Sequence, residues 1–174
     1  MKTNCLIVYF SHIGEAYVGG DIKMLNVGNT HAAAVMMQSL LQCDMERIEP
    51  KIPYPINYKQ MIDVAKQELQ TDARPQIKGH LSDIKNYDTI ILGYPNWWGT
   101  MPMIVETYLE SNDFTNKTIL PFCTNEGSGM GSSEKDLCRL CESSEIKAGL
   151  PIIGGQVYQA MPQIKAWLKR NNLL

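Results

Sequence analysis

The chain has little of what marks nucleic-acid-binding or membrane proteins. Its 16 basic and 18 acidic residues are scattered and leave a formal net charge of −2, which excludes a broad basic surface for nucleic acid. The early apolar stretch, residues 5–10, is too short to cross a bilayer, and it carries neither a basic leader nor a cleavage-site pattern. We therefore expect a cytoplasmic protein that makes no membrane insertion and binds no nucleic acid.

Cysteine is also sparse, and its pattern does not suggest cross-links. The five cysteines are an odd count at irregular spacings, which favours reduced thiols in a chain of this size. Cys138 and Cys141 form a C-x-x-C spacing, but they fall inside a helix-like segment, whereas a reactive thiolate is activated at a helix start. Two cysteines are only half of a structural zinc site. We expect the pair to pack in the interior and expect no metal site.

Short apolar runs alternate with longer amphipathic segments along all 174 residues, without a linker or an internal repeat. This pattern predicts a single α/β domain over residues 1–174. Helical patterns separate the expected strands, so we predict a doubly wound, five-stranded parallel sheet with helices on both faces. The strands are expected at residues 5–10, 45–49, 89–94, 118–123 and 150–153. Ligands of such sheets bind beyond the carboxyl ends of the strands.

The segment from about residue 12 to residue 27 is too long for an ordinary strand-to-helix turn. Two partly apolar pieces, residues 16–18 and 22–25, flank Gly19-Gly20-Asp21, which predicts a small inserted hairpin. Such an insertion is either a flap beside a ligand or a surface hairpin without a functional role, and the sequence leaves both interpretations open.

A split phosphate-binding pattern lies on either side of this insertion. Ser11 closes the first apolar run, and Gly28, Asn29 and Thr30 open the next helix-like stretch. Backbone N–H groups at a helix N-terminus, with hydroxyl and amide side chains nearby, bind phosphate well. Neither piece contains a lysine or a strict G-x-G-x-x-G, so a monophosphate fits better than a triphosphate or a dinucleotide. The alternative is an ordinary turn in which Asn29 or Thr30 caps the helix.

Two further loops suit a planar ligand. After the third expected strand come Pro95, Asn96, Trp97, Trp98 and Gly99, and the two indoles offer flat surfaces for stacking. We expect one indole to stack on the ligand and the other to pack, the alternative being a hydrophobic plug. The fourth expected strand leads into a polar, glycine-rich loop that could wrap a heterocycle, formed by Thr124, Asn125, Glu126, Gly127, Ser128 and Gly129.

Together these segments resemble the three FMN loops of the flavodoxin-like family, and the resemblance covers essentially the whole chain. It implies a strand order of 2-1-3-4-5. It also implies bound FMN, with the phosphate surrounded by Ser11, His12, Asn29 and Thr30 beside Gly28, and with the isoalloxazine held by residues 95–99 and 124–129. A backbone group near Gly99 is then expected to contact the ring. Typical family members have an unbroken first loop, whereas residues 12–27 divide it here.

A flavin carries out the redox chemistry itself, so we expect no catalytic acid–base dyad. The resemblance implies an oxidoreductase or electron-transfer protein that works through FMN. One form is a reductase that uses NAD(P)H to reduce quinone-like acceptors, because the Pro-x-x-Trp-Gly segment resembles a loop of quinone reductases with this fold. Another is a one-electron carrier that docks to a redox protein partner, although such carriers are strongly acidic and this chain is not. A third is a non-catalytic binding module.

The remaining aromatic residues receive no chemical role. Tyr54 and Tyr58 follow the second expected strand, and we place them at an edge away from the ligand crevice. Trp167 falls on the apolar face of the last helix, where we expect it in the core, while a homodimer through that helix stays open.

Overall fold

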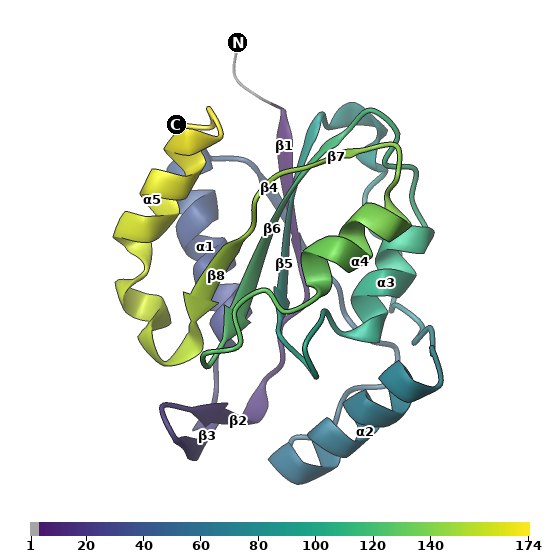
Figure 1. The fold of residues 1–174 in the computed structure, drawn as a ribbon, viewed down its shortest axis with the longest axis vertical. Helices are drawn as coiled ribbons and strands as arrows, with labels where there is room; N and C mark the ends of the chain where they lie inside the picture. Colours follow the sequence, from purple (N-terminus) through teal and green to yellow (C-terminus); the bar gives the residue numbers. More distant parts are fainter. Residues whose placement is uncertain (1–3) are drawn as a thin grey trace.

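The computed structural model describes residues 4–174 and places a parallel sheet between two layers of helices (Figure 1). The strands of this sheet are β1 (Cys5–Tyr9), β4 (Asp44–Arg47), β5 (Thr89–Pro95), β6 (Thr118–Asn125), β7 (Glu145–Ile146) and β8 (Leu150–Ile153). Their order is β4-β1-β5-β6, and the short strands β7 and β8 pair with successive parts of β6. With β7 and β8 sharing the fifth position, the sheet has the predicted 2-1-3-4-5 order. The predicted fifth strand is β8, and β7 was not anticipated.

Helices cover both faces of the sheet, as predicted. They are α1 (Asn29–Leu41), α2 (Tyr58–Gln70), α3 (Met103–Glu110), α4 (Ser133–Leu140) and α5 (Met161–Arg170), with short 3-10 turns η1 (Ile84–Asn86) and η2 (Gly154–Gln159). α1 and α5 lie on one face, and α3 and α4 on the other (Figure 1). Every residue of β1 is buried because both of its faces are covered, which explains its unbroken apolar sequence.

Three predictions about single residues concern this core. Trp167 is 2% exposed and donates its indole N–H to the carbonyl of Ala148 at 3.0 Å, so its predicted core position is confirmed. Cys141 is buried, as expected, but Cys138 is exposed on α4, so the two thiols do not share one environment.

Among residues 4–174, none of the helices is long and apolar enough to cross a membrane.

Two elements extend the fold beyond the carboxyl ends of the sheet strands. The insertion forms the antiparallel hairpin β2 (Gly14–Val18) and β3 (Asp21–Leu25). Its turn uses Gly19 and Gly20 at φ of 62° and 96°, which L side chains rarely adopt. The hairpin and α2 lie at the same end of the molecule, where β5, β6 and β8 finish (Figure 1). Together they add walls to that end of the sheet.

Candidate functional site

A cavity of about 370 Å³ opens at the carboxyl ends of the strands. All three predicted loops reach it, through Ser11, His12, Asn29, Thr30, Pro95, Asn96, Trp97, Trp98, Thr124, Asn125, Glu126 and Ser128. The predicted glycines Gly28, Gly99, Gly127 and Gly129 do not line it, and they shape the loops instead. The topology therefore brings together three chain segments that are far apart in the sequence. Within the described part of the chain, no cluster of side chains is suited to hold a metal ion.

One end of the cavity is the first turn of α1. The hydroxyl oxygen of Ser11 accepts a hydrogen bond from the backbone N–H of His31 at 3.1 Å, so a side chain from another loop caps the helix. The backbone N–H groups of Asn29 and Thr30 have no hydrogen-bond partner within residues 4–174. Thr30 is fixed through its hydroxyl, which lies 2.8 Å from that of Thr124 at the end of β6. This arrangement leaves donors and the positive end of the helix dipole for an anion.

Gly28 permits the close approach on which this end depends. Its backbone is ordinary for any residue, with φ of −68° and ψ of 144°. A Cβ atom at this position, however, would lie 2.2 Å from Oγ of Ser11 and 2.3 Å from the carbonyl oxygen of His12. Only glycine fits between the first loop and the start of α1 without moving one of them.

His12 contributes a buried polar atom without a partner. Its Nε2 makes no hydrogen bond to any residue that the structure describes. Burial, with a smaller contribution from the nearby Arg47 guanidinium, lowers the pKa of His12 below its ordinary value of 6.5, and the same two causes lower the pKa of His31. Nδ1 of His31 is held 2.5 Å from the hydroxyl of Tyr9. Both shifts favour the neutral imidazole at pH 7.

This pKa shift predicts a pH dependence of stability. The unfolded chain binds a proton on His12 more readily than the folded protein does, so the free energy of unfolding decreases as the pH falls through the range below 6.5. We expect the variant His12→Asn to lose part of this dependence and to give a flatter profile between about pH 5 and pH 7. Urea unfolding of both proteins across that range measures the difference, and parallel profiles would contradict the assignment.

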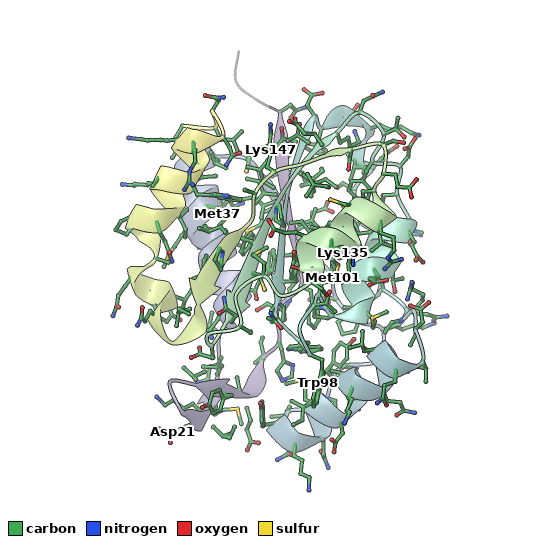
Figure 2. The ribbon with its side chains drawn as sticks, in the orientation of Figure 1. Asp21, Met37, Trp98, Met101, Lys135 and Lys147 are labelled. Carbon is green, nitrogen blue, oxygen red and sulfur yellow. The ribbon has the colours of Figure 1, made fainter. Side chains whose placement is uncertain are left out.

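Another part of the cavity lining is aromatic. Trp97 packs edge-on against Phe10, Tyr54 and His12, with ring centroids 5.3, 4.9 and 5.9 Å away. Trp98 remains 48% exposed and lies beside α2, where its indole N–H donates to the carbonyl of Ile62 at 2.9 Å (Figure 2). The ammonium of Lys66 lies 5.1 Å from the centre of the Trp98 ring. One indole is thus built into an aromatic cluster, and the other keeps a free surface.

The two indoles stand on a tight turn that is held from several sides. Trp98 and Gly99 have φ of 55° and 86°, and Trp97 and Thr100 exchange backbone hydrogen bonds across the turn. The N–H of Gly99 donates to the Asn96 side chain at 3.0 Å, and its carbonyl accepts from the N–H of Ser132 at 2.7 Å. Both polar backbone groups of Gly99 therefore have protein partners, and the residue does not line the cavity where we expected it to meet a ligand.

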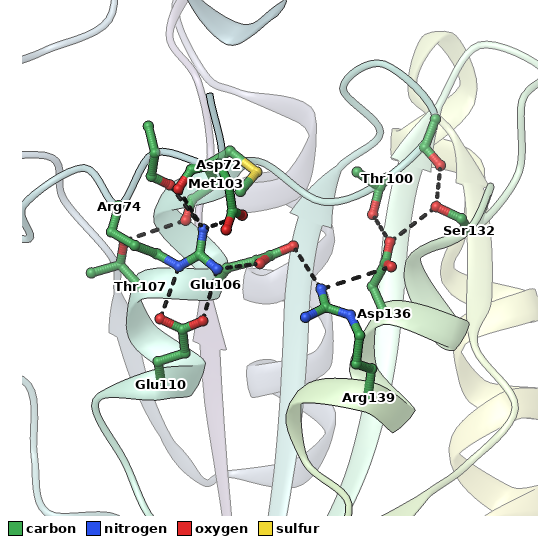
Figure 3. Close-up of polar contacts among 12 residues, drawn as sticks. Asp72, Arg74, Thr100, Met103, Glu106, Thr107, Glu110, Ser132, Asp136 and Arg139 are labelled. Carbon is green, nitrogen blue, oxygen red and sulfur yellow. Dashed lines mark hydrogen bonds and ion pairs between the residues drawn. The ribbon is translucent and has the colours of Figure 1, made fainter. Parts of the chain in front are cut away.

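A polar network anchors this turn to the helices behind it (Figure 3). The carboxylate of Asp136 on α4 accepts hydrogen bonds from the hydroxyls of Thr100 and Ser132, at 2.6 and 3.0 Å. Arg139 lies between Asp136 and the buried Glu106 of α3, which also pairs with Arg74 at 3.0 Å. These contacts hold the indole-bearing loop against α4, which Arg139 in turn joins to Glu106 of α3.

The third loop is organised by one side chain. Oδ1 of Asn125 accepts hydrogen bonds from the backbone N–H groups of Gly127 and Gly129, at 2.9 and 3.0 Å. The Asn96 amide donates to the carbonyl of Gly129 at 3.0 Å, which joins the second loop to the third. The glycines thus give this loop its shape, while Thr124 and Ser128 face the cavity.

Two carboxylates hold the hairpin over the cavity. Glu126 accepts hydrogen bonds from the N–H of Gly19 in the hairpin turn, at 3.0 Å, and of Gly155 in η2, at 2.7 Å. At the opposite end, Glu15 accepts from the N–H of Tyr58, at 2.8 Å, at the start of α2. Because both carboxylates bind backbone N–H groups, the hairpin is attached to two neighbouring elements of the fold.

Part of the cavity wall was not predicted. Tyr58, Met61, Ile62 and Ala65 of α2 line it, and so does Gly154. Ala16, Tyr17 and Leu25 of the hairpin also line the cavity, which agrees with the interpretation of the insertion as a flap beside a ligand. The expectation that the Tyr54 and Tyr58 region lies away from the crevice is therefore wrong. The hydrogen bonds from Tyr58 to Glu15 and from Trp98 to Ile62 draw α2 toward the ligand end. The apolar positions Met61 and Ala65 mark an inward helix face, but the sequence does not show what that face covers.

Comparisons with known proteins agree with this architecture. Residues 23–171 match a family model described as flavodoxin. Two crystal structures of proteins provisionally described as flavoproteins superpose well. The protein from Bacteroides eggerthii superposes with a TM-score of 0.75 at 26% sequence identity, and the match covers 97% of each chain. The protein from Bacteroides uniformis superposes with a TM-score of 0.76 at 25% sequence identity, and the match covers 97% of this chain and 99% of the other. A flavoprotein from Lactobacillus acidophilus, solved in complex with FMN, has a TM-score of 0.67 at 18% identity, covering 90% and 97% of the two chains. No curated protein matches the sequence.

Proposed function

Because this chain belongs to the flavodoxin family, we propose that it binds FMN in the cavity and acts as an oxidoreductase through it. The observation that carries the proposal is the arrangement of that cavity. It has unpartnered donors at the start of α1 and two indoles beside α2, as a ligand with a phosphate and a flat ring requires. A volume of about 370 Å³ falls in the range of small cofactor sites. When bound, FMN supplies the redox chemistry by accepting and giving up electrons.

The protein's part at the phosphate end is binding by neutral donors. The Ser11 oxygen already accepts from His31, so its own O–H is left to donate to a phosphate oxygen. The free N–H groups of Asn29 and Thr30 add two donors on the helix axis. His12, whose Nε2 is buried without a partner in residues 4–174, supplies another polar group once an anion is present. These groups fix the cofactor's position without direct contact from a lysine or an arginine.

At the ring end the protein excludes water and supplies flat contacts. Trp98 offers the free indole surface, while Trp97 holds the loop in place through its aromatic cluster. Met61 and Ala65 of α2 form an apolar wall on the same side. Stacking and apolar burial therefore act on the isoalloxazine, and polar contacts act on the phosphate.

In this proposal the hairpin covers the bound cofactor and slows its dissociation, and Glu126 holds the hairpin in place. Glu126→Ala removes two charge-assisted hydrogen bonds, to Gly19 and Gly155, so we expect FMN to dissociate about tenfold faster. Glu142→Ala removes an exposed carboxylate elsewhere and serves as the control for charge. Recovery of free-flavin fluorescence after dilution measures the rate. Equal rates in Glu126→Ala and the wild type would show that the hairpin does not retain the cofactor.

Among redox roles we favour a reductase that takes electrons from NAD(P)H and passes them to a quinone-like acceptor. The small net charge of −2 suits an enzyme better than a carrier that is steered to basic partners. The half-exposed Trp98 and the α2 wall offer an apolar approach to the ring. The FMN-loaded protein should oxidise NADPH or NADH rapidly in the presence of menadione. Turnover that requires an added partner reductase would favour the carrier, and a protein that takes up no FMN would be a binding module of another kind.

A further inference from the structure

We propose that Arg47, which does not line the cavity, supplies the positive charge that favours the phosphate of FMN, from a position against the backbone of the first loop. This inference rests on the proposed function and adds a residue outside the cavity lining. Arg47 ends β4 and lies opposite Tyr9 of β1 in the parallel register. Its guanidinium donates from Nη2 to the carbonyl of Ser11 at 2.9 Å, so the cation contacts the backbone of the loop whose side chain faces the phosphate end.

The lining of the cavity leaves the phosphate charge uncompensated. Among the residues that the structure describes, no lysine or arginine lines it. His12 is the one basic side chain of the described residues that does, and burial lowers its pKa, which favours its neutral form at pH 7. The one acidic side chain in the lining, Glu126, is engaged by the N–H groups of Gly19 and Gly155. A phosphate that arrives here gains hydrogen bonds from neutral groups, but no contacting cation.

The positive charge of Arg47 is not neutralised by an ion pair with an acidic side chain of the described residues, although the structure has several other ion pairs. Glu49, two residues further along the chain, pairs with Lys78 at 3.7 Å instead. Nε of Arg47 is buried and has no hydrogen-bond partner in the described part of the chain. A partly buried cation without a counter-ion is costly, and an anion at the adjacent helix start would reduce that cost.

The charge of Arg47 also reaches both sides of the phosphate end. It lowers the pKa of His12 in the first loop and of His31 in the first turn of α1, in each case after burial as the larger cause. Ser11, whose carbonyl receives the hydrogen bond from Arg47, precedes His12 in the chain and accepts a hydrogen bond from the N–H of His31. A phosphate held by Ser11, Asn29 and Thr30 lies within the same field.

A comparison of FMN with riboflavin isolates this effect, since riboflavin has the same ring but no phosphate. Arg47→Gln should weaken FMN binding about tenfold and leave riboflavin binding unchanged, because only FMN carries the charge. Arg47→Lys keeps the cation, and its ratio of FMN to riboflavin affinity should stay within about threefold of the wild type. Lys78→Gln, the control, removes one positive charge from an exposed side chain and should alter neither affinity. Fluorescence titration of each apo-protein measures the constants.

The outcomes separate the two proposals. If Arg47→Gln leaves the ratio of FMN to riboflavin affinity unchanged, or if Arg47→Lys lowers that ratio as far as Arg47→Gln does, Arg47 acts on the loop and not through its charge, and the inference is wrong. Unchanged binding of both ligands overturns it as well. Should Arg47→Gln fail to fold, Arg47→Lys decides, because a collapse of its affinity ratio would show that charge is not what matters. A wild-type protein that binds neither flavin would instead defeat the proposed function.

Discussion

The substitution Gly28→Ala should reduce FMN affinity at least about 100-fold while the protein still folds. Its Cβ would lie 2.2 Å from Oγ of Ser11 and 2.3 Å from the carbonyl oxygen of His12, so the first loop must move away from α1. That movement breaks the bond between Ser11 and the N–H of His31 and misplaces the donors for the phosphate. Two lost hydrogen bonds to a charged group account for a change of this size. Fluorescence titration with FMN measures it.

Gly155→Ala is the matched control for this substitution. It also adds one methyl group, at the residue after Gly154 of the cavity lining, but its closest neighbour is Cγ1 of Val18 at an ordinary 3.4 Å. We expect less than a threefold change in FMN affinity for the control, because no atom has to move far. Comparable losses in the two variants would mean that the first loop is not where the phosphate binds.

Trp97→Ala should lower the free energy of unfolding of the apo-protein by about 3 kcal/mol, as the loss of a large packed aromatic side chain does. Trp97 holds Phe10, Tyr54 and His12 together in one cluster, so its removal leaves three rings without a shared partner. The half-exposed neighbour Trp98 provides the contrast. Trp98→Ala should cost about 1 kcal/mol or less in stability, while it removes the free indole surface available to the flavin.

Urea unfolding of the two apo-proteins, followed by FMN titration, tests this division of labour. The expected pattern is a large stability loss for Trp97→Ala, with weaker binding that follows from the damaged loop, and weaker binding with nearly intact stability for Trp98→Ala. If Trp98→Ala is the more destabilised variant, the assignment of the two indoles is reversed.

The central elements of the fold follow directly from the sequence. Buried parallel strands read as continuous apolar runs, and this pattern identified β1, β5 and β6 with small errors at their ends. The last strand, β8, was also predicted, although only alternate residues of it are buried. The position of the ligand end then followed from the topology of doubly wound sheets. The split of the last sheet position into β7 and β8 escaped prediction, because a strand of two residues carries too little periodicity to register.

The parts of the candidate site that depend on short sequence motifs could be predicted, whereas the parts that depend on contacts between distant residues could not. Ser11, Asn29 and Trp98 were recognisable from their loops, and all three line the cavity. The α2 wall was missed because its position depends on hydrogen bonds such as Tyr58 to Glu15, between residues far apart in the chain. Gly99 shows the converse error, since its turn was evident but the Asn96 and Ser132 partners of its backbone were not.

The most direct test of this account is a titration of the purified apo-protein with FMN, followed by flavin absorbance and fluorescence, with riboflavin in a parallel experiment. We predict one FMN bound per chain with quenched fluorescence, and clearly weaker binding of riboflavin, because the start of α1 contributes only when a phosphate is present. Absence of FMN uptake, or equal affinity for the two flavins, would contradict the claim that the cavity is built around a phosphate and a flavin ring.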